Sequence, residues 1–331
     1  MAVNIIELSD LTKKYGSYTA VDHLNLTIRK GEVFGLLGPN GAGKSTTILM
    51  MLGLTDPTSG SVKVCGIDST GNPIEVKRKV GYLPEDVGFY DDRTGLENLV
   101  YTAQLNGISK NDAITKAEQL LTRIGLSEDA GKKAGKYSRG MRQRLGLADV
   151  LIKNPEVIIL DEPTLGIDPT GVKEFLELIV GLSKEEGLTV LFSSHHLHQV
   201  QQVCDRVGLF VKGKLLAEGD IPSLSRKLFA NSPYTIEVGI SQIMKGDQDT
   251  ARERITESSM SEMLKHVDGI NSVTLKKNLF QIQCFSDSTA EIARIVVESG
   301  AELNYLSKKE YGLDDIYYRY FEGSEQNEKS T

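Results

Sequence analysis

The residues best suited to chemistry form two short segments that lie far apart in the chain. The first is "GPNGAGKST", residues 38–46, where Gly38, Gly43, Lys44 and Ser45 meet the pattern G-x-x-x-x-G-K-[ST]. Glycines let backbone N–H groups approach phosphate oxygens, and the lysine and hydroxyl that follow supply a cation and a Mg²⁺ ligand. The spacing therefore predicts a P-loop, which binds the phosphates of a nucleoside triphosphate.

The expected contacts of this P-loop follow from the residue types. Lys44 reaches the β- and γ-phosphates, Ser45 binds Mg²⁺, and Thr46 adds a hydroxyl to the α-phosphate. A helix that begins near Lys44 points its positive end at the same phosphates. A dinucleotide-binding turn is excluded, because Thr46 stands where that pattern needs a third glycine. The expected nucleotide contacts here are Gly38, Pro39, Asn40, Gly41, Ala42, Gly43, Lys44, Ser45 and Thr46.

The second segment, "VIILDEPT", places two adjacent carboxylates after a run of apolar residues. Such a run predicts a buried strand, and α/β sheets bind ligands at the carboxyl ends of their strands. We expect Asp161 to bind or orient Mg²⁺ and Glu162 to position and deprotonate the attacking water. The alternative is a solvated acidic strand end, which the P-loop in the same chain disfavours.

The elements that position these segments predict an α/β fold. "EVFGLLG", "EVIILDEP" and "LTVLFSS" are strand patterns that alternate with helical ones, and this alternation indicates a largely parallel sheet wrapped by helices. Apolar spacing of i, i+3, i+4 dominates residues 85–151, a helical subdomain inserted into an ATPase domain of residues 1–225. A strand before the P-loop and a helix after it argue against a chance match.

A second domain is predicted after a linker. Pro and Asn breakers suggest a linker at residues 226–233, and strand and helix patterns then follow in the order βαββαβ over residues 234–322. This order predicts a small α+β domain with the ferredoxin-like arrangement. It shows no catalytic constellation, so we expect it to assist dimerisation or docking. The polar residues 323–331 are expected to be a disordered tail.

Composition limits the function classes. The chain has 331 residues and a net charge of −7, which disfavours binding to a phosphate backbone. Its three cysteines are far apart and odd in number, which indicates a reducing compartment without a disulfide framework. No apolar run approaches the roughly 18 to 20 residues that span a bilayer, and the start of the chain lacks a signal-peptide pattern. We therefore expect a cytoplasmic protein.

With these motifs the chain resembles the ATPase subunit of an ATP-binding cassette (ABC) transporter over residues 1–225. The resemblance implies that Tyr15 of "KKYG" stacks on adenine and that His195 of "FSSHH" senses the γ-phosphate. It also implies that Asp168 of "TLGID" crosses a dimer interface. In "GYLPED", Glu85 stands where the family has a glutamine that links Mg²⁺ and water to the membrane partner. A carboxylate there can still reach Mg²⁺, with altered local electrostatics.

"YSRGM", residues 137–141, stands where the family has the signature Leu-Ser-Gly-Gly-Gln. Ser138 and Gly140 match, whereas Tyr137, Arg139 and Met141 depart from it. The resemblance implies that this segment closes over ATP held by a second subunit in a head-to-tail pair. Within the family, the segments around Glu85 and Ser138 are most similar to subunits of ABC-2-type exporters. There is a weaker likeness to the ATPase of the transporter that matures copper sites in nitrous oxide reductase.

The resemblance implies a P-loop ABC cassette that hydrolyses ATP with Mg²⁺, as a homodimer or with a paralogous ATPase subunit. It would drive an integral membrane permease and lie on the inner face of the cell membrane, with no nucleic acid partner. The open alternatives are a soluble ABC ATPase acting on nucleic acid or the ribosome, and a small-molecule kinase. Locally, Tyr15 could instead belong to the core. The three histidines His195, His196 and His198 could instead hold a metal, although no carboxylate or cysteine completes their spacing.

Overall fold

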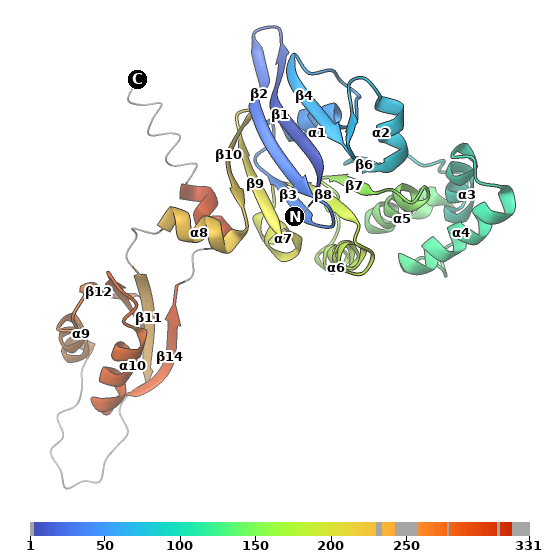
Figure 1. Ribbon diagram of the computed structural model, residues 1–331. Coiled ribbons are helices and arrows are strands. Elements are labelled where there is room, and N and C mark those ends of the chain that lie inside the picture. Colours follow the sequence, from blue (N-terminus) through green and yellow to red (C-terminus); the bar gives the residue numbers. More distant parts are fainter. Residues whose placement is uncertain (1–2, 230–233, 242–256, 277, 310–311, 320–331) are drawn as a thin grey trace. The chain divides into compact units, whose positions relative to one another are not determined.

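The described residues fold as two units, one formed by those within 1–224 and 317–331 and the other by those within 225–316 (Figure 1). Each unit has its own cluster of buried hydrophobic residues. The structure, a computed structural model, describes residues 3–229, 234–241, 257–276, 278–309 and 312–319.

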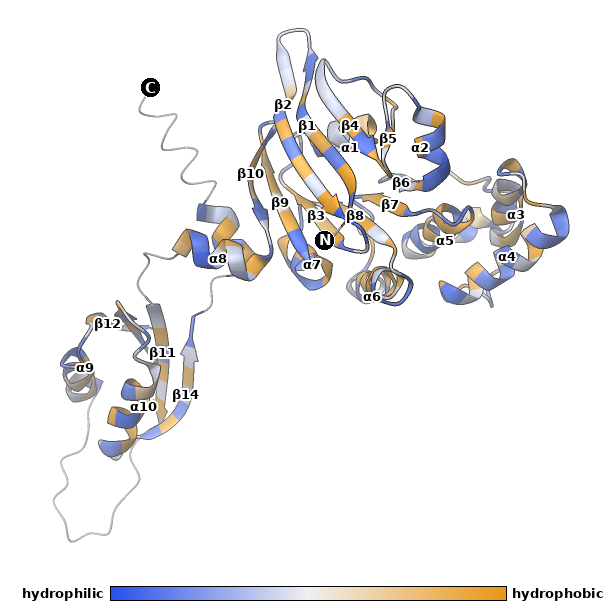
Figure 2. Cartoon of the chain, in the orientation of Figure 1, coloured by the Kyte–Doolittle hydropathy of each residue, from blue (hydrophilic) through white to orange (hydrophobic). Residues whose placement is uncertain are grey.

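A six-stranded sheet carries the two segments singled out by their chemistry. Its strands, in spatial order, are β10 (Lys214–Gly219), β9 (Arg206–Val211), β3 (Val33–Leu37), β8 (Thr189–Ser194), β7 (Val157–Asp161) and β6 (Val80–Leu83). All neighbouring pairs are parallel except β10 and β9. Every residue of β3, β7 and β8 is buried, and hydrophobic colour runs along β7 in Figure 2. Strands covered on both faces need such continuous apolar runs.

A second, antiparallel sheet covers one side of the first. Its strands, in spatial order, are β2 (Tyr18–Arg29), β1 (Asn4–Tyr15), β4 (Ser59–Val64) and β5 (Ile67–Asp68). Helix α1 (Lys44–Met51) packs against β2 and β4, and its Ile48 shares a core cluster with Phe34 and Phe210 of the parallel sheet. The helix that follows the P-loop therefore lies in the hydrophobic layer between two sheets, which fixes its amino end. Helix α2 (Pro73–Lys79) precedes β6.

Helices cover the opposite face and extend beyond the β6 edge of the parallel sheet. Helix α7 (Leu197–Val203) packs against β3 and β8, and α6 (Pro169–Glu186) against β8. The inserted helices are α3 (Gly95–Leu105), α4 (Lys110–Arg123), the short 3₁₀-helix η1 (Ala134–Lys136) and α5 (Arg139–Leu151). They fall within the predicted helical subdomain. Helix α5 packs against β6, where a Cβ on Gly81 would lie 2.2 Å from Val150 Cγ1.

Helix α8 (Ile221–Phe229) occupies the first half of the segment predicted as a linker. The breaker Pro222 stands in its first turn, where proline needs no N–H partner and does not interrupt the helix. Asp220 begins the helix, because its Oδ1 accepts from Ser223 N at 2.8 Å. Residues 226–229 are thus helical rather than irregular, and residues 230–233 lie outside the described part of the chain.

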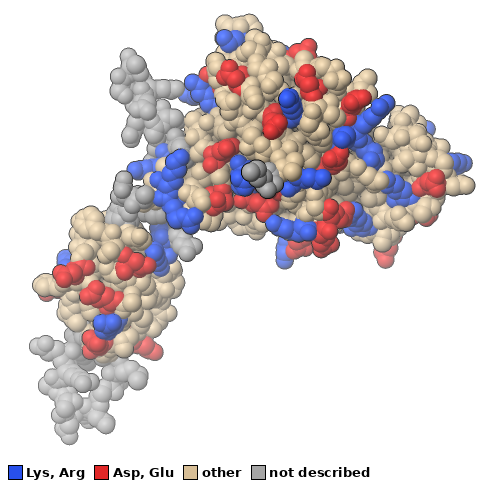
Figure 3. All heavy atoms as spheres, in the orientation of Figure 1, with Lys and Arg blue, Asp and Glu red and all other residues tan. Residues whose placement is uncertain are grey.

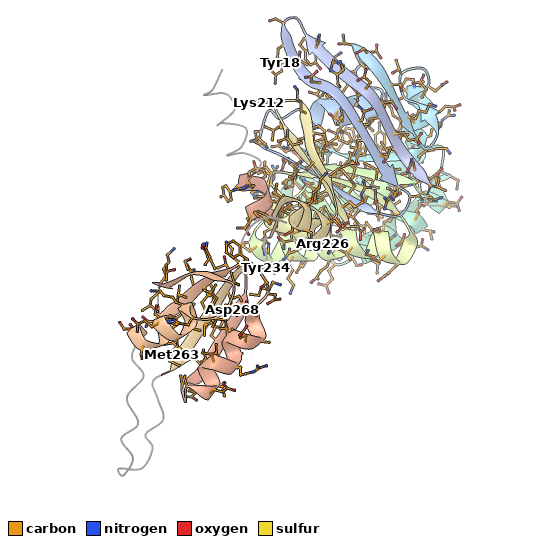
Figure 4. All side chains as sticks on the ribbon, turned by 60° about the vertical axis from the view of Figure 1, so that its left-hand side comes forward. Tyr18, Lys212, Arg226, Tyr234, Met263 and Asp268 are labelled. Carbon is orange, nitrogen blue, oxygen red and sulfur yellow. The ribbon has the colours of Figure 1, made fainter. Side chains whose placement is uncertain are left out.

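The second unit is a four-stranded antiparallel sheet with two helices. Its elements in chain order are β11 (Tyr234–Ser241), α9 (Glu257–Lys265), β12 (Ile270–Lys276), β13 (Leu279–Cys284), α10 (Thr289–Glu298) and β14 (Glu302–Lys308). The spatial order β12-β13-β11-β14 is the ferredoxin-like arrangement predicted from the sequence. Tyr234 begins β11, with Lys308 Nζ of β14 4.5 Å from its ring centroid (Figure 4). The predicted tail, residues 323–331, lies outside the described residues.

Candidate functional site

The P-loop joins β3 to α1, and neighbouring strands hold it closely. A Cβ on Gly38 would lie 2.3 Å from Phe210 O, and a Cβ on Gly43 would lie 2.4 Å from Ala20 O, so no larger residue fits either position. Gly43 also has φ 102, which side chains strongly disfavour. Gly213 N donates to Ala42 O at 2.9 Å, which ties the loop to the turn between β9 and β10. Backbone contacts thus hold the loop before any ligand arrives.

Lys44 is buried at the first position of α1, and its ammonium group has three partners. Its Nζ donates to Gly38 O at 2.7 Å and to Pro39 O at 3.2 Å. It also lies 3.3 Å from Oε1 of Glu162, and both side chains are about nine-tenths buried. The P-loop lysine and the predicted catalytic carboxylate therefore contact each other directly.

Glu162 also contacts His195. Oε2 of Glu162 lies 2.9 Å from His195 Nδ1, and the His195 side chain is 30% exposed. Glu162 has φ 47, an uncommon backbone conformation for a residue with a side chain. Its N–H donates to Ser193 O at 3.0 Å, which ties the end of β7 to β8. The structure thus brings together three residues predicted from separate segments.

Asp161 ends β7 beside Ser193 of β8. Asp161 is 6% exposed, and neither its Oδ1 nor the Ser193 Oγ has a hydrogen-bond partner among the described residues. Burial, and secondly the charge of Asp161, raises the pKa of Tyr82 on the neighbouring β6 to about 12. An unpartnered buried carboxylate oxygen at a strand end is suited to a hard cation such as Mg²⁺.

The remaining predicted contacts near the P-loop are open to solvent. Ser45 is exposed and Thr46 is half-buried. Tyr15 is the last residue of β1 and pairs across the hairpin with Tyr18, which is labelled in Figure 4. The Tyr15 side chain is 50% exposed, so it does not belong to the core. Lys13 Nζ lies 5.0 Å from the Tyr15 ring centroid. The ring is therefore available to stack on a planar ligand.

Three other predicted residues lie at the ends of helices and strands. Glu85 follows β6 and is exposed, and Asp168 is the N-cap of α6, where its Oδ1 accepts from Gly171 N at 3.0 Å. Ser138 is the exposed N-cap of α5, and its Oγ accepts from Met141 N at 3.2 Å. A Cβ on Gly140 would lie 3.2 Å from Ile167 Cγ2, so the start of α5 packs on the segment before Asp168.

Tyr137, a departure from the family signature, and the arginines that follow the signature all have partners within the chain. Tyr137 is 7% exposed, and its hydroxyl donates to Asp129 O at 2.7 Å, inside the helical subdomain. Arg142 pairs with Asp91 at 2.7 Å and Arg144 with Glu174 at 3.1 Å. These two arginines of α5 are thus ion-paired within the chain. On the face shown in Figure 3, acidic and basic side chains are interspersed over the first unit, unlike the basic stripe of a nucleic-acid surface.

The histidine-rich turn after β8 does not form a metal site in the described part of the chain. No group of three His, Cys, Asp or Glu residues there could hold a metal ion. The rings of His195 and His196 lie 4.0 Å apart, and partial burial, with His195 beside it, lowers the pKa of His196. His195 instead contacts Glu162.

Sequence reasoning missed several contacts around these residues. Thr164 Oγ1 donates to Gln199 Oε1 at 2.6 Å, and Arg139 and Gln143 reach backbone carbonyls of distant segments. The only sequence signal was the spacing of Arg139 and Gln143, which puts both on one face of α5.

A P-loop whose lysine contacts a buried glutamate two strands away is the site of a P-loop nucleoside triphosphatase. The chain belongs to the ABC transporter family. The family model described as "ABC transporter" matches residues 21–165.

The relatives are ATP-binding proteins of transporters. The chain is 37% identical to the bacitracin transport ATP-binding protein BcrA of Bacillus licheniformis, over 96% of this chain and 98% of that protein. It is 37% identical to the linearmycin resistance ATP-binding protein LnrL of Bacillus subtilis, over 68% of this chain and 72% of that protein. A dimeric ATP-binding cassette in a post-hydrolysis state with ADP and Pi has a TM-score of 0.60 and 26% identity, over 65% of this chain and 98% of that chain. The protein is therefore an ATP-hydrolysing subunit of an ABC transporter. No helix in the described residues is long and apolar enough to cross a bilayer.

Proposed function

We propose that this ATPase works as a pair, in which Ser138 and Gly140 of one subunit close over ATP held by the P-loop of the other. The observation that carries the proposal is the position of Ser138, exposed at the start of α5. Within the described residues, no hydrogen bond or ion pair joins residues 137–141 to residues 38–46. The dimeric cassette among the solved structures further supports a homodimer or a pair with a paralogous subunit.

Within each site we propose separate roles for the residues around Glu162. Lys44 binds the β- and γ-phosphates, and Glu162 deprotonates the attacking water once the phosphates occupy Lys44. His195 orients Glu162 through the 2.9 Å contact and senses the γ-phosphate. Tyr15 stacks on adenine, and Asp168 crosses to the other subunit. Gly38, Pro39, Asn40, Gly41, Ala42, Gly43, Ser45 and Thr46 complete the nucleotide contacts.

The residues present fit Mg²⁺. Asp161 supplies a buried carboxylate oxygen without a described partner, and Ser45 supplies an exposed hydroxyl at the start of α1. Glu85 supplies a further carboxylate after β6. When bound, Mg²⁺ neutralises charge on the phosphate oxygens.

We propose that the pair drives a separate integral membrane permease and lies on the cytoplasmic face of the membrane. Two relatives that match over 96% of the chain are named for bacitracin transport, which supports bacitracin as the first substrate to test. Purification in detergent should recover the chain with a polytopic membrane protein. Recovery with nucleic acid and no permease would contradict this part of the proposal.

The pairing is tested with Ser138→Asp in a Glu162→Gln background. Aspartate preserves the N-cap of α5 but places a negative charge against the γ-phosphate of the second subunit. We expect Glu162→Gln to elute as a dimer with Mg²⁺-ATP, whereas the double variant binds ATP with unchanged affinity and stays monomeric.

The control is Ser109→Asp, because Ser109 is the exposed N-cap of α4 and also accepts a backbone N–H. Its Oγ also donates to Asp112 at 2.7 Å, so the added charge is locally less favourable there than at residue 138, which makes the control the stricter one. We expect this control to dimerise normally. If Ser138→Asp weakens ATP binding by the monomer, Ser138 serves its own P-loop and the proposed pairing is wrong.

A further inference from the structure

Arg139 connects three parts of the first unit that the chain brings together from distant positions. Its Nε donates to Leu165 O at 2.7 Å, and its Nη2 donates to Glu85 O at 3.2 Å. Arg139 itself is the first residue of α5, directly after Ser138. One guanidinium group thus joins the signature helix to the segment after β6 and to the segment after β7.

The surroundings of Arg139 are shaped for these contacts. A Cβ on Gly166, where φ is +73, would lie 3.1 Å from both Cδ and Nε of Arg139, so the arginine stem lies flat against the backbone at that position. Gln143, one turn further along α5 and 2% exposed, donates from Nε2 to the same Glu85 carbonyl at 3.0 Å. Two residues on one face of α5 therefore hold the Glu85 backbone.

The segment that Arg139 contacts leads directly to Asp168. Thr164, at its start, is held by Gln199 of α7, and Ile167 packs against Gly140. Arg139 thus binds the carbonyl of Glu85 itself and a carbonyl three residues before Asp168. The proposed function gives both Glu85 and Asp168 roles at the paired ATP sites. A glycine, which the family signature has at this position, offers no side chain for either bond.

We propose that Arg139 is a positioning residue that ties the Glu85 and Asp168 segments to the start of α5. The segment at the subunit's own ATP, with Glu85, then moves together with the two segments that face the other subunit, with Ser138 and Asp168. This inference rests on the proposed function. Both hydrogen-bond acceptors are backbone carbonyls, and the ion pair of Arg139 with Asp86 is long, at 3.9 Å, and involves a 96% exposed carboxylate, so the geometry of the guanidinium group matters more than its charge. Lysine keeps the charge but lacks a planar fork with donors in fixed directions.

The test compares Arg139→Lys and Arg139→Met with Arg142→Lys. Arg142 lies on the same helix, and its guanidinium group donates to Asp91 and Ala134 of the helical subdomain rather than to the carbonyls of Glu85 or Leu165. We expect both Arg139 variants to lower kcat about five- to tenfold through the loss of two ordinary hydrogen bonds, while KM for ATP changes less than about twofold. Amide hydrogen exchange should rise at residues 164–168 and 85–86, and not elsewhere. The Arg142 variant should match the wild-type chain in both measurements.

Wild-type kcat and wild-type exchange in Arg139→Lys would overturn the inference. So would an equal loss of kcat in Arg142→Lys, or exchange that rises uniformly over the first unit, since either indicates general destabilisation. The proposed pairing fails separately, when the Glu162→Gln chain does not dimerise with ATP. A local rise in exchange in the Arg139 variants would then still support the link.

Discussion

Replacing Glu162 by glutamine should separate ATP binding from ATP hydrolysis. Glutamine preserves the volume and the oxygen that faces His195, but it removes the charge that pairs with Lys44 at 3.3 Å and the group that takes a proton from water. Phosphates that bind Lys44 must compete with Glu162 for its ammonium group. The substitution removes both the competitor and the base.

The magnitudes follow from this geometry. Two charges 3.3 Å apart attract by about 5 kcal/mol at an effective dielectric constant of about 20. The cost of removing both from water cancels most of this, which leaves about 1–2 kcal/mol for ATP to overcome. We therefore expect Glu162→Gln to bind ATP about 5- to 30-fold more tightly. Loss of the general base should lower kcat about 10²- to 10⁴-fold.

The assays are a titration with a fluorescent ATP analogue and phosphate release at saturating Mg²⁺-ATP. Glu32→Gln is the matched control, because Glu32 is also buried and paired with an arginine, Arg206, at 2.8 Å. Glu32 precedes β3, at the end of the strand opposite the P-loop. We expect this control to lower the free energy of unfolding by up to about 3–5 kcal/mol while kcat stays within about twofold.

Two results would contradict the two roles given to Glu162, as the base and as the competitor for Lys44. Wild-type turnover by Glu162→Gln would exclude Glu162 as the base. Weaker binding of ATP by the variant would show that Glu162 does not compete with the phosphates for Lys44.

Two further predictions concern an exposed ring and an exposed carboxylate. Tyr15→Ala should weaken ATP binding about fivefold or more through lost stacking worth roughly 1–3 kcal/mol, whereas Tyr15→Phe should bind normally, and equal loss in both variants would exclude stacking. In the second unit, hydrogen bonds from Lys308 and Thr289 lower the pKa of Asp287 from 3.8 to about 2. This carboxylate therefore stabilises the fold above pH 4, and the contribution is lost as the pH falls from about 4 toward 2. Because the side chain is 48% exposed, we expect Asp287→Asn to cost less than about 1 kcal/mol at pH 7 in urea unfolding, with a difference that shrinks below pH 4; a constant difference would contradict the assignment.

The parts of the site that the sequence predicts are those whose residues are neighbours in the chain. The P-loop is one short segment, so its glycines, Lys44 and the following helix are recognisable from spacing alone. The meeting of Lys44 with Glu162 follows once the strands are taken as parallel, because their carboxyl ends then share one edge. The order β9-β3-β8-β7-β6 itself could not be derived from the spacing, since pairing depends on packing between distant strands.

The contacts of Arg139 and the course of α8 were not predictable for different reasons. Arg139 binds the carbonyls of residues 85 and 165. Every residue has a backbone carbonyl, so the residue types at these positions do not indicate such a contact. Pro222 suggested an irregular segment, but a proline is also tolerated in the first turn of a helix. The sequence alone does not distinguish these two positions. Here Asp220 caps the amino end of α8 and so places Pro222 in the first turn.

The bracing of the P-loop by its neighbours has a consequence for the entropy cost of binding ATP. Ordering a free loop costs about 1–2 kcal/mol per residue in conformational entropy, and ligands that order their own site bear that cost on each encounter. Here Gly38 and Gly43 already abut Phe210 and Ala20, and Gly213 already holds Ala42. For the backbone of this loop the cost is met once, when the chain folds, so ATP binding does not have to order residues 38–43 again on each cycle.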